Sequence, residues 1–377
     1  MKKRFAVTYR IQAKNNSDAR DKAEKICIEQ TVEFPPAHIK DKYILNNIIG
    51  KIESIRPAGK GSYVTVITYA DESGGGEVTQ LLNVLLGNSS IIPGIRIENI
   101  SLSPSLLIKY KGPRFGIAGI RKILGVYNRP LLCSAIKPMG TSAKRLAKLA
   151  GKFALGGLDM IKDDHGLADQ EFSPFKERVS RVCKAVRRSE KIAGTRCLYA
   201  PNITADGGET LKRARFAKKA GAGALVISPA LCGFGTVKEI ADDPSIGLPI
   251  LMHPAFMGAF TTSCQSGISH AALYGTIARL CGADATIFPN FGGRFSFSKE
   301  ECASIAVSAR DKHGRLKPIF PAPGGGMQLE TVKQMVDFYG KDVLFLMGGG
   351  LFSAGPVIYA EDLSYSRDAE TRAFVFY

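Results

Sequence analysis

The sequence predicts an α/β protein in which a C-terminal (β/α)8 TIM barrel follows a ferredoxin-like α+β domain. After Arg121, short apolar runs alternate with amphipathic helical segments, and eight such units fit the roughly 250 residues that a closed barrel needs. The first hundred residues instead follow the order β-α-β-β-α-β. An open doubly wound sheet is the competing fold, but no G-x-G-x-x-G motif follows the first strand of the second region. We therefore expect domains at residues 1–112 and 113–377.

The elements of the first domain follow from periodicity. Residues 5–11 alternate like a strand. Ser17 is expected to cap a helix in which Ala19, Ala23 and Ile26 recur at helical spacing. Two further strands flank a glycine-containing turn, and a second helix precedes a closing strand. These later elements are expected at residues 51–55, 63–69, 77–86 and 95–102.

The second region carries eight apolar runs of the kind that form buried parallel strands. Amphipathic segments separate them; in one, Thr141 or Ser142 begins the helix and Gly156–Gly157 ends it. The strands are expected at residues 131–137, 158–163, 195–202, 224–229, 249–253, 285–290, 318–323 and 343–347.

Composition excludes several classes of protein. The chain has 377 residues, 45% of them hydrophobic, and no uncharged apolar run of about 18 residues, so we expect a cytoplasmic protein without a membrane partner. The net charge of +17 is spread along the chain without zinc-finger spacing or an RNA-binding aromatic motif, which argues against a nucleic-acid partner. Eight cysteines without a C-x-x-C pair indicate buried free thiols, with Cys264 the candidate for exposure.

Two glycine triplets give the strongest phosphate signal. Gly324, Gly325 and Gly326 follow the seventh barrel strand, and Gly348, Gly349 and Gly350 follow the eighth. Loops after these two strands commonly hold phosphate in such barrels, because glycine lets backbone N–H groups approach an anion. Tight turns are the alternative interpretation. A phosphorylated small-molecule substrate is expected, and Arg294 either binds its second anionic end or is a surface charge.

Four consecutive ionisable residues, Lys162 to His165, end the second barrel strand. Burying them is costly unless they are paired or bind a metal ion. Carboxylates suit Mg²⁺, while an imidazole suits softer ions better. A plain ion pair between the lysine and the carboxylates remains the alternative to a metal site.

Lys137 and His253 end the first and fifth barrel strands. A strand-end lysine could shuttle a proton if desolvation lowers its pKa, or it could be a second phosphate contact. His253 could be an acid/base group, a hydrogen-bond donor to the substrate or a satisfied core residue. The three remaining histidines lack such surroundings and are expected to be structural or exposed: His38, His270 and His313.

Several segments together resemble the large subunit of RuBisCO. They are GPRFGIAGIRKILGVYNRPLLCSAIKP at 112–138, GGLDMIKDDH at 156–165, PAPGGGMQ and LFLMGGG, and they occur in the family order across two domains. The resemblance implies that Lys162 is carbamylated by carbon dioxide and holds Mg²⁺ with Asp164. It implies that Lys137 handles protons during enolisation and that His253 contacts the substrate.

The same resemblance implies roles for residues in three other places. Arg294 falls on a lysine of the sixth barrel loop that polarises a carboxylate, and the glycine triplets fall on phosphate-binding backbone. Glu29 and Asn88 fall where the family completes the active site of the partner subunit. A homodimer with shared active sites follows from that position.

The chain departs from the carboxylases at several of these positions. His165 replaces the glutamate that would be the third metal ligand, Met139 replaces the second lysine of K-P-K, and Arg294 replaces a lysine. Pro254 and Met257 replace an arginine and a histidine, and the small domain reads EQTVEFP instead of a Gly-Thr loop. Losing Lys and Arg contacts weakens recognition of a bisphosphate. The pattern is similar to the RuBisCO-like proteins, called form IV.

This resemblance implies an enzyme that abstracts a proton next to a carbonyl and stabilises the enediolate. The expected substrate is a phosphorylated sugar or thiosugar of the methylthio-ketose phosphate class, with isomerisation ahead of other outcomes. Three alternatives remain: a decarboxylase of a phosphorylated keto-acid sugar, a sugar-phosphate-binding homologue without turnover, and a weak ribulose-bisphosphate carboxylase.

Overall fold

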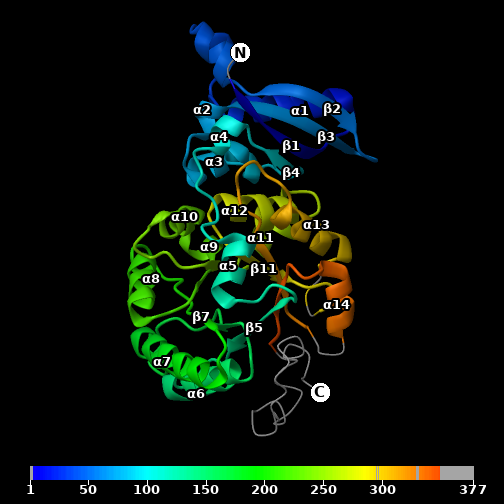
Figure 1. Cartoon of the computed structure of the whole chain (residues 1–377). Coiled ribbons are helices and arrows are strands. Elements are labelled where there is room, and N and C mark those ends of the chain that lie inside the picture. Colours follow the sequence, from blue (N-terminus) through cyan, green and yellow to red (C-terminus); the bar gives the residue numbers. More distant parts are fainter. Residues whose placement is uncertain (1–2, 294, 296, 328–330, 349–377) are drawn as a thin grey trace.

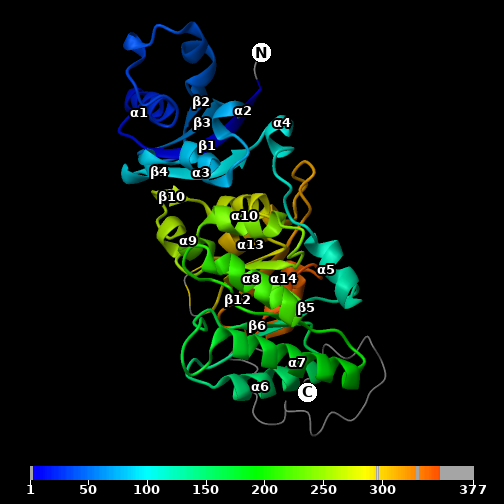
Figure 2. The same ribbon diagram turned by 90° about the vertical axis from the view of Figure 1, so that its left-hand side faces the viewer.

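The computed structural model describes residues 3–293, 295, 297–327 and 331–348. A small sheet domain lies against one flank of a larger barrel, next to the helices α10 (Phe234–Asp242) and η4 (Ala271–Ile277) (Figures 1 and 2). Both predicted architectures are confirmed, whereas the division at residue 112 stays a prediction.

The N-terminal domain has the ferredoxin-like strand order β4-β1-β3-β2, with antiparallel pairs throughout. The side chains of Phe5, Val7, Tyr9 and Ile11 alternate on one buried face of β1, as the period of two requires. The elements are β1 (Arg4–Gln12), α1 (Asn16–Glu29), η1 (Pro36–His38), η2 (Ile44–Ile48), β2 (Lys51–Pro57), β3 (Ser62–Ala70), α2 (Asp71–Gly74), α3 (Val78–Leu85), η3 (Asn88–Ile91), β4 (Ile95–Ser101) and α4 (Pro104–Leu107).

The first helix begins earlier than the sequence suggested. The side chain of Asn15 accepts a hydrogen bond of 2.9 Å from the backbone N–H of Asp18, so Asn15 caps α1 and Ser17 lies inside it. Both residue types are good caps. The assignment of Ser17 as the cap was therefore wrong by two residues.

Eight parallel strands form the barrel in the order β7-β6-β5-β13-β12-β11-β9-β8. A bridge between Asn202 and Val226 joins the two ends of this series and closes the ring. The strands are β5 (Leu131–Ile136), β6 (Met160–Asp163), β7 (Leu198–Ala200), β8 (Leu225–Ile227), β9 (Ile250–Met252), β11 (Ala285–Pro289), β12 (Phe320–Gly324) and β13 (Leu344–Leu346). All eight expected strands are present, and each is shorter than expected.

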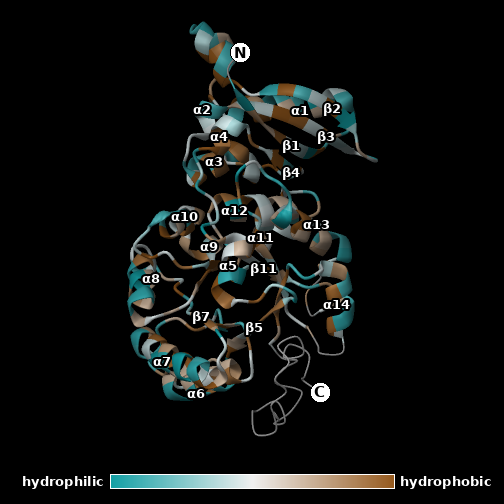
Figure 3. Cartoon of the chain, viewed as in Figure 1, coloured by the Kyte–Doolittle hydropathy of each residue, from teal (hydrophilic) through white to brown (hydrophobic). Residues whose placement is uncertain are grey.

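Helices surround this ring, with polar and apolar stripes visible on α7 and α8 in Figure 3. Helix α5 instead closes the N-terminal end of the barrel, where Ile117, Ile120 and Leu124 pack on side chains from the barrel interior. The helices are α5 (Gly116–Leu124), α6 (Ala143–Leu155), α7 (Phe175–Ala193), α8 (Glu209–Ala220), α9 (Pro229–Cys232), α10, α11 (Gly258–Thr261), η4, α12 (Ala278–Leu280), α13 (Lys299–Arg310) and α14 (Val332–Tyr339).

The two domains share a sheet edge. The short strand β10 (Gly267–Ile268), which comes from the barrel region, pairs with β4 of the N-terminal domain. The Arg96 guanidinium on β4 donates hydrogen bonds to the backbone oxygens of Thr261 and Ser263. The junction is therefore held by backbone pairing and by a buried arginine.

Two further expectations concern membrane-spanning helices and the exposure of the cysteines. In the parts that the structure describes, no helix has the length and apolar character needed to cross a membrane. Cys264 is exposed, as expected, while the other seven cysteines are buried or half-buried free thiols.

Candidate active site

The predicted strand-end residues Lys137, Lys162 and His253 gather at the C-terminal end of the barrel strands, which we call the mouth of the barrel. Lys162 pairs in register with Ala135 on β5, so Lys137 follows it on the neighbouring strand. On the other side of β5 lies β13, which leads to Gly348. A Cβ atom placed on Gly348 would lie 3.2 Å from the Lys137 Nζ atom. Lys137, Lys162 and Gly348 thus lie at the same end of the barrel.

Lys162 lies at the floor of this mouth and is 2% exposed. Its ammonium donates a hydrogen bond of 2.8 Å to the backbone oxygen of Asp163. Burial lowers the pKa of Lys162, and the positive charge of Lys137 lowers it further, against the opposing effect of Asp163 and Asp164. A lysine in such a site is more easily deprotonated, which both base chemistry and reaction with carbon dioxide require.

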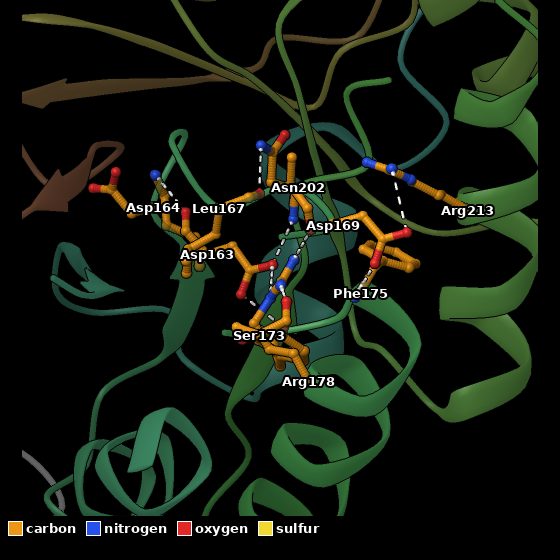
Figure 4. Close-up of polar contacts among 12 residues, drawn as sticks. Asp163, Asp164, Leu167, Asp169, Ser173, Phe175, Arg178, Asn202 and Arg213 are labelled. Atoms are coloured by element: carbon orange, nitrogen blue, oxygen red, sulfur yellow. Dashed lines mark hydrogen bonds and ion pairs between the residues drawn. The ribbon is translucent and has the colours of Figure 1, made fainter. Parts of the chain in front are cut away.

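The two aspartates after Lys162 face opposite sides of the strand. Asp163 is fully buried in the barrel wall, where it accepts hydrogen bonds from Arg178 (3.1 Å), the Tyr199 hydroxyl (2.7 Å) and the backbone N–H of Asn202 (3.1 Å). Figure 4 shows Asp163 and Arg178 together below the loop. Asp163 therefore holds the strand end in place, and Asp164 is the carboxylate available at the mouth.

The loop after β6 is tied down by backbone contacts. The Asn202 amide donates hydrogen bonds of 3.0 Å to the backbone oxygens of His165 and Leu167 (Figure 4). Arg178 also donates to the backbone oxygens of Ser173 and Ala168 at 2.6 and 2.7 Å. These contacts fix the segment that presents Asp164 and His165 before any ligand binds.

Two histidines from different strands stack across the mouth. The rings of His165, after β6, and His253, after β9, have centroids 4.6 Å apart and planes 17° apart. Burial lowers the pKa of His253 well below its usual value, and the charges of Lys162 and His165 add to this effect. The His253 Nδ1 atom accepts from the backbone N–H of Ala255 at 3.2 Å, so the neutral ring carries its proton on Nε2.

The glycine turn after β12 lies next to the loop between β11 and α13. The backbone N–H of Asn290 donates a hydrogen bond of 2.7 Å to the Gly324 oxygen. Gly325 and Gly326 have φ angles of +81° and +120°, which side chains other than glycine rarely adopt. A Cβ on Gly293 would collide with the Gly325 oxygen, so both loops need glycine for this close approach. Arg294, Gly349 and Gly350 lie outside the described residues.

The KDDH segment brings two groups that can bind a divalent ion, Asp164 and His165, to the mouth of the barrel. The Asp164 Oδ1 and His165 Nδ1 atoms lie 3.5 Å apart and are the two ligand-type groups of the KDDH segment that face it. Within the described parts of the chain, no three His, Cys, Asp or Glu side chains are grouped so as to hold an ion. A carbamate on Lys162 would supply a further carboxylate donor beside these two groups. His165 makes the set more suitable for a softer ion than Mg²⁺.

Glu29 and Asn88 lie together in the N-terminal domain, away from the mouth of their own barrel. The Asn88 amide donates to the carboxylates of Glu29 at 3.0 Å and Glu33 at 3.4 Å. They line a polar cavity of about 200 Å³ with Glu33, Ser73, Gln80, Asn83 and neighbouring residues. Within one chain, the structure does not bring this pair to Lys162.

Sequence reasoning did not single out Arg178 and Glu33. Arg178 is fully buried against Asp163 although 15 residues separate them, and no motif indicates this contact. Glu33 adopts a φ of +46°, which is unusual for a residue with a side chain and often marks a functional site. The alternation of side chains along β6 could have separated Asp163 from Asp164 in advance.

Comparison with known proteins gives consistent matches over almost the whole chain. Residues 116–360 match the family described as ribulose bisphosphate carboxylase large chain, catalytic domain. Ribulose bisphosphate carboxylase-like protein 1 of Rhodopseudomonas palustris is 39% identical over 94% of both chains. The 5-methylthioribulose-1-phosphate isomerase of Rhodospirillum rubrum is 37% identical over 94% of this chain and 93% of its own.

More distant relatives and solved structures agree with these matches. A 2,3-diketo-5-methylthiopentyl-1-phosphate enolase of Microcystis aeruginosa is 31% identical over 93% of this chain and 89% of its own. The crystal structure of a Rubisco-like protein from R. palustris superimposes with a TM-score of 0.85 at 40% identity, covering 92% of this chain and 94% of that one. The chain therefore belongs to the ribulose bisphosphate carboxylase large-chain family, within its RuBisCO-like, form IV branch.

Proposed function

We propose that this protein is an enolising enzyme that acts on a phosphorylated thiosugar of the methylthio-ketose phosphate class. It removes a proton next to a carbonyl group, stabilises the enediolate and returns the proton at a neighbouring carbon. Isomerisation is the favoured outcome, ahead of the enolase reaction, because the relative with the isomerase name is 37% identical and those with the enolase name are 31–34% identical.

The meeting of three kinds of group in one mouth supports this proposal. Lys162 is a buried amine with a lowered pKa, Lys137 lies beside the Gly348 turn, and His253 presents an Nε2–H group. A base, a proton carrier and a neutral hydrogen-bond donor are the groups that an enolisation uses.

Each group then has a defined task. The glycine turns hold the phosphate through their backbone N–H groups. As a carbamate, Lys162 takes the proton through an oxygen, Lys137 carries protons between carbon and oxygen, and His253 donates a hydrogen bond to a substrate oxygen. Carbamylated Lys162, Asp164 and His165 would hold a divalent ion, and that ion, when bound, would supply Lewis-acid stabilisation of the enediolate. Arg294 steers an anionic or oxygen-rich part of the substrate.

We propose in addition that the protein is a homodimer with shared active sites. Glu29 and Asn88 lie far from their own barrel mouth yet line a polar cavity at the surface. In a two-fold dimer, the same surface of the second copy can face the first barrel. Each site would then combine the barrel of one chain with Glu29 and Asn88 of the other.

Hydrogen–deuterium exchange at the substrate tests the enolisation directly. The protein is incubated with 5-methylthioribulose 1-phosphate in D₂O, and proton NMR follows the signal next to the carbonyl. We expect deuterium to enter at that carbon and an isomerised product to accumulate. Lys162→Ala is the matched control, in which neither change is expected.

The same assay separates the alternatives. Binding of the phosphate ester in a calorimeter without deuterium entry would indicate a binding homologue, and release of carbon dioxide from a phosphorylated keto acid would indicate a decarboxylase. Labelled bicarbonate with ribulose bisphosphate tests the carboxylase alternative, and we expect no label in the product. Deuterium entry without isomerised product, from a diketo substrate, would favour the enolase reaction.

A further inference from the structure

We propose that His270, outside the active-site mouth, positions the loop of residues 290–298 between β11 and α13. This loop carries Arg294 and borders the glycine turn after β12. The effect on catalysis rests on the function proposed above, whereas the effect on the loop itself does not.

His270 contacts the C-terminal end of the loop through its ring, which packs on Phe297, and through its Nδ1 atom, which faces Glu301. His270 immediately precedes η4 and is 5% exposed. Its Nδ1 atom lies 3.3 Å from the Glu301 Oε1 atom. Its ring packs edge to face on Phe297, with centroids 4.4 Å apart and planes 70° apart. Tyr274 contacts Phe297 from the next turn, with centroids 6.0 Å apart.

Glu301 connects this contact to the start of α13. Its Oε2 atom accepts a hydrogen bond of 2.8 Å from the backbone N–H of Ser298, and the Ser298 hydroxyl accepts one of 3.1 Å from the Glu301 N–H. This reciprocal pair is a capping box, which fixes the direction in which the chain enters the helix. One carboxylate therefore contacts His270 and accepts a hydrogen bond from the last residue of the loop.

The near end of the loop rests on the glycine turn that is expected to hold phosphate. Asn290 donates its backbone N–H to the Gly324 oxygen, and Gly293 approaches the backbone of Gly325 too closely to allow a side chain. A Cβ on Gly325 would lie 3.1 Å from the Phe295 ring. Phe295 thus lies against the glycine turn, and it is two residues before Phe297, which His270 contacts.

The backbone next to His270 is held by hydrogen bonds to the N-terminal domain. The neighbouring Ser269 donates its backbone N–H to the Ile97 oxygen and its hydroxyl to the Glu98 oxygen, both at 2.8 Å. These acceptors belong to β4, the edge strand that pairs with β10. His270 thus connects the edge of the N-terminal sheet to the loop. A residue that only filled space in the core would not make this connection.

Amide hydrogen exchange measured by mass spectrometry tests the loop directly. We expect His270→Ala to speed exchange in the peptide covering residues 291–298 at least fivefold. His270→Phe keeps the ring contact with Phe297 and loses the contact with the Glu301 carboxylate, so an intermediate increase is expected. The control is His313→Ala, which removes a half-buried histidine beyond the other end of α13.

Two readouts connect the loop to the site. Titration with inorganic phosphate needs no turnover, and we expect His270→Ala to weaken its binding at least threefold. With the sugar phosphate, we expect KM to rise more than kcat falls, since no reacting atom touches His270.

A folded His270→Ala protein with wild-type exchange at residues 291–298 would overturn the proposal, and so would an equal increase in the exchange rate in His313→Ala. If turnover is absent from the wild type while loop exchange responds, the proposed function fails and the positioning role of His270 stands.

Discussion

Lys162 and Phe256 show how the surroundings of single residues set both reactivity and strain. Lys162 combines burial with a neighbouring positive charge, and both favour its neutral amine. Phe256, three residues after His253, has a φ of +67° although it is not glycine, and its side chain is 65% exposed. A strained residue at a strand end beside a site is a common feature of binding pockets.

Replacing Lys162 tests its place in the chemistry. We expect Lys162→Ala to lower kcat at least about a hundredfold, the usual range for loss of a general base. Lys148→Ala, which changes an exposed lysine on α6, should leave kcat unchanged. Initial rates with the sugar phosphate give the comparison, and full activity in Lys162→Ala would remove this residue from the mechanism.

Replacing Phe256 tests whether its backbone is strained. We expect Phe256→Gly to raise the free energy of unfolding by about 0.5 kcal/mol, because relief of an unfavourable left-handed conformation exceeds the entropic cost of glycine. Phe260→Gly, within α11, should instead lower it by about 1 kcal/mol. Urea unfolding measures both values. A loss of stability in Phe256→Gly would mean that its contacts outweigh the strain.

At the scale of elements, Asp284 joins the lower ends of several barrel segments. Its carboxylate accepts backbone hydrogen bonds from Phe115 and Gly116 at 2.7 Å and from Ile250 at 3.1 Å. Helix α5 begins at Gly116 and strand β9 at Ile250, so one side chain ties the closing helix to the ring. Burial nevertheless raises the pKa of Asp284 to about 6.

This pKa predicts a pH dependence of stability. The folded state binds the proton more tightly than the unfolded chain, so the contribution is complete below pH 3.8 and is lost as pH rises to about 6. Between pH 4.5 and 7.5 it amounts to about 2 kcal/mol. We expect Asp284→Asn to reduce the fall in unfolding free energy over this interval by that amount. Asp206→Asn, at an exposed site, is the control, and an unchanged slope in Asp284→Asn would contradict the assignment.

The elements also show what the sequence could predict. The apolar runs located all eight barrel strands, because buried strands need apolar residues over their whole length. Their ends were less certain: the third was expected at 195–202 and covers Leu198–Ala200. The strand-end rule also predicted that Lys137, Lys162 and the glycine turn would meet. It could not predict the partner of Asp163, because contact with Arg178 depends on how α7 packs.

For the whole molecule, the proposed shared active site requires a second chain. Glu29 and Asn88 are separated from Lys162 within a chain, so the proposed site is complete only when a second copy supplies them. The mass of one chain is 40.6 kDa, and we expect a particle of about 81 kDa or a multiple of it in light scattering. A monomer of full activity would exclude shared sites.

Mixing two inactive variants tests the sharing itself. Glu29→Ala and Lys162→Ala damage different parts of the proposed composite site. After unfolding and refolding together in equal amounts, half of the dimers are mixed, and one of their two sites has both parts intact. About a quarter of wild-type activity should therefore return. Each variant refolded alone is the control, and no recovery from a mixture that forms mixed dimers would contradict the arrangement.

The distribution of thiols offers a way to see that arrangement without changing the sequence. Cys264 is exposed beside the domain junction, and the seven other cysteines are buried or half-buried. A maleimide or nitroxide reagent used in brief, limiting amounts should therefore attach first at this position. In a symmetric pair, two such labels give a single separation in pulsed electron resonance. The distance between the two labels would report how the subunits of the proposed dimer are oriented and whether substrate changes their spacing.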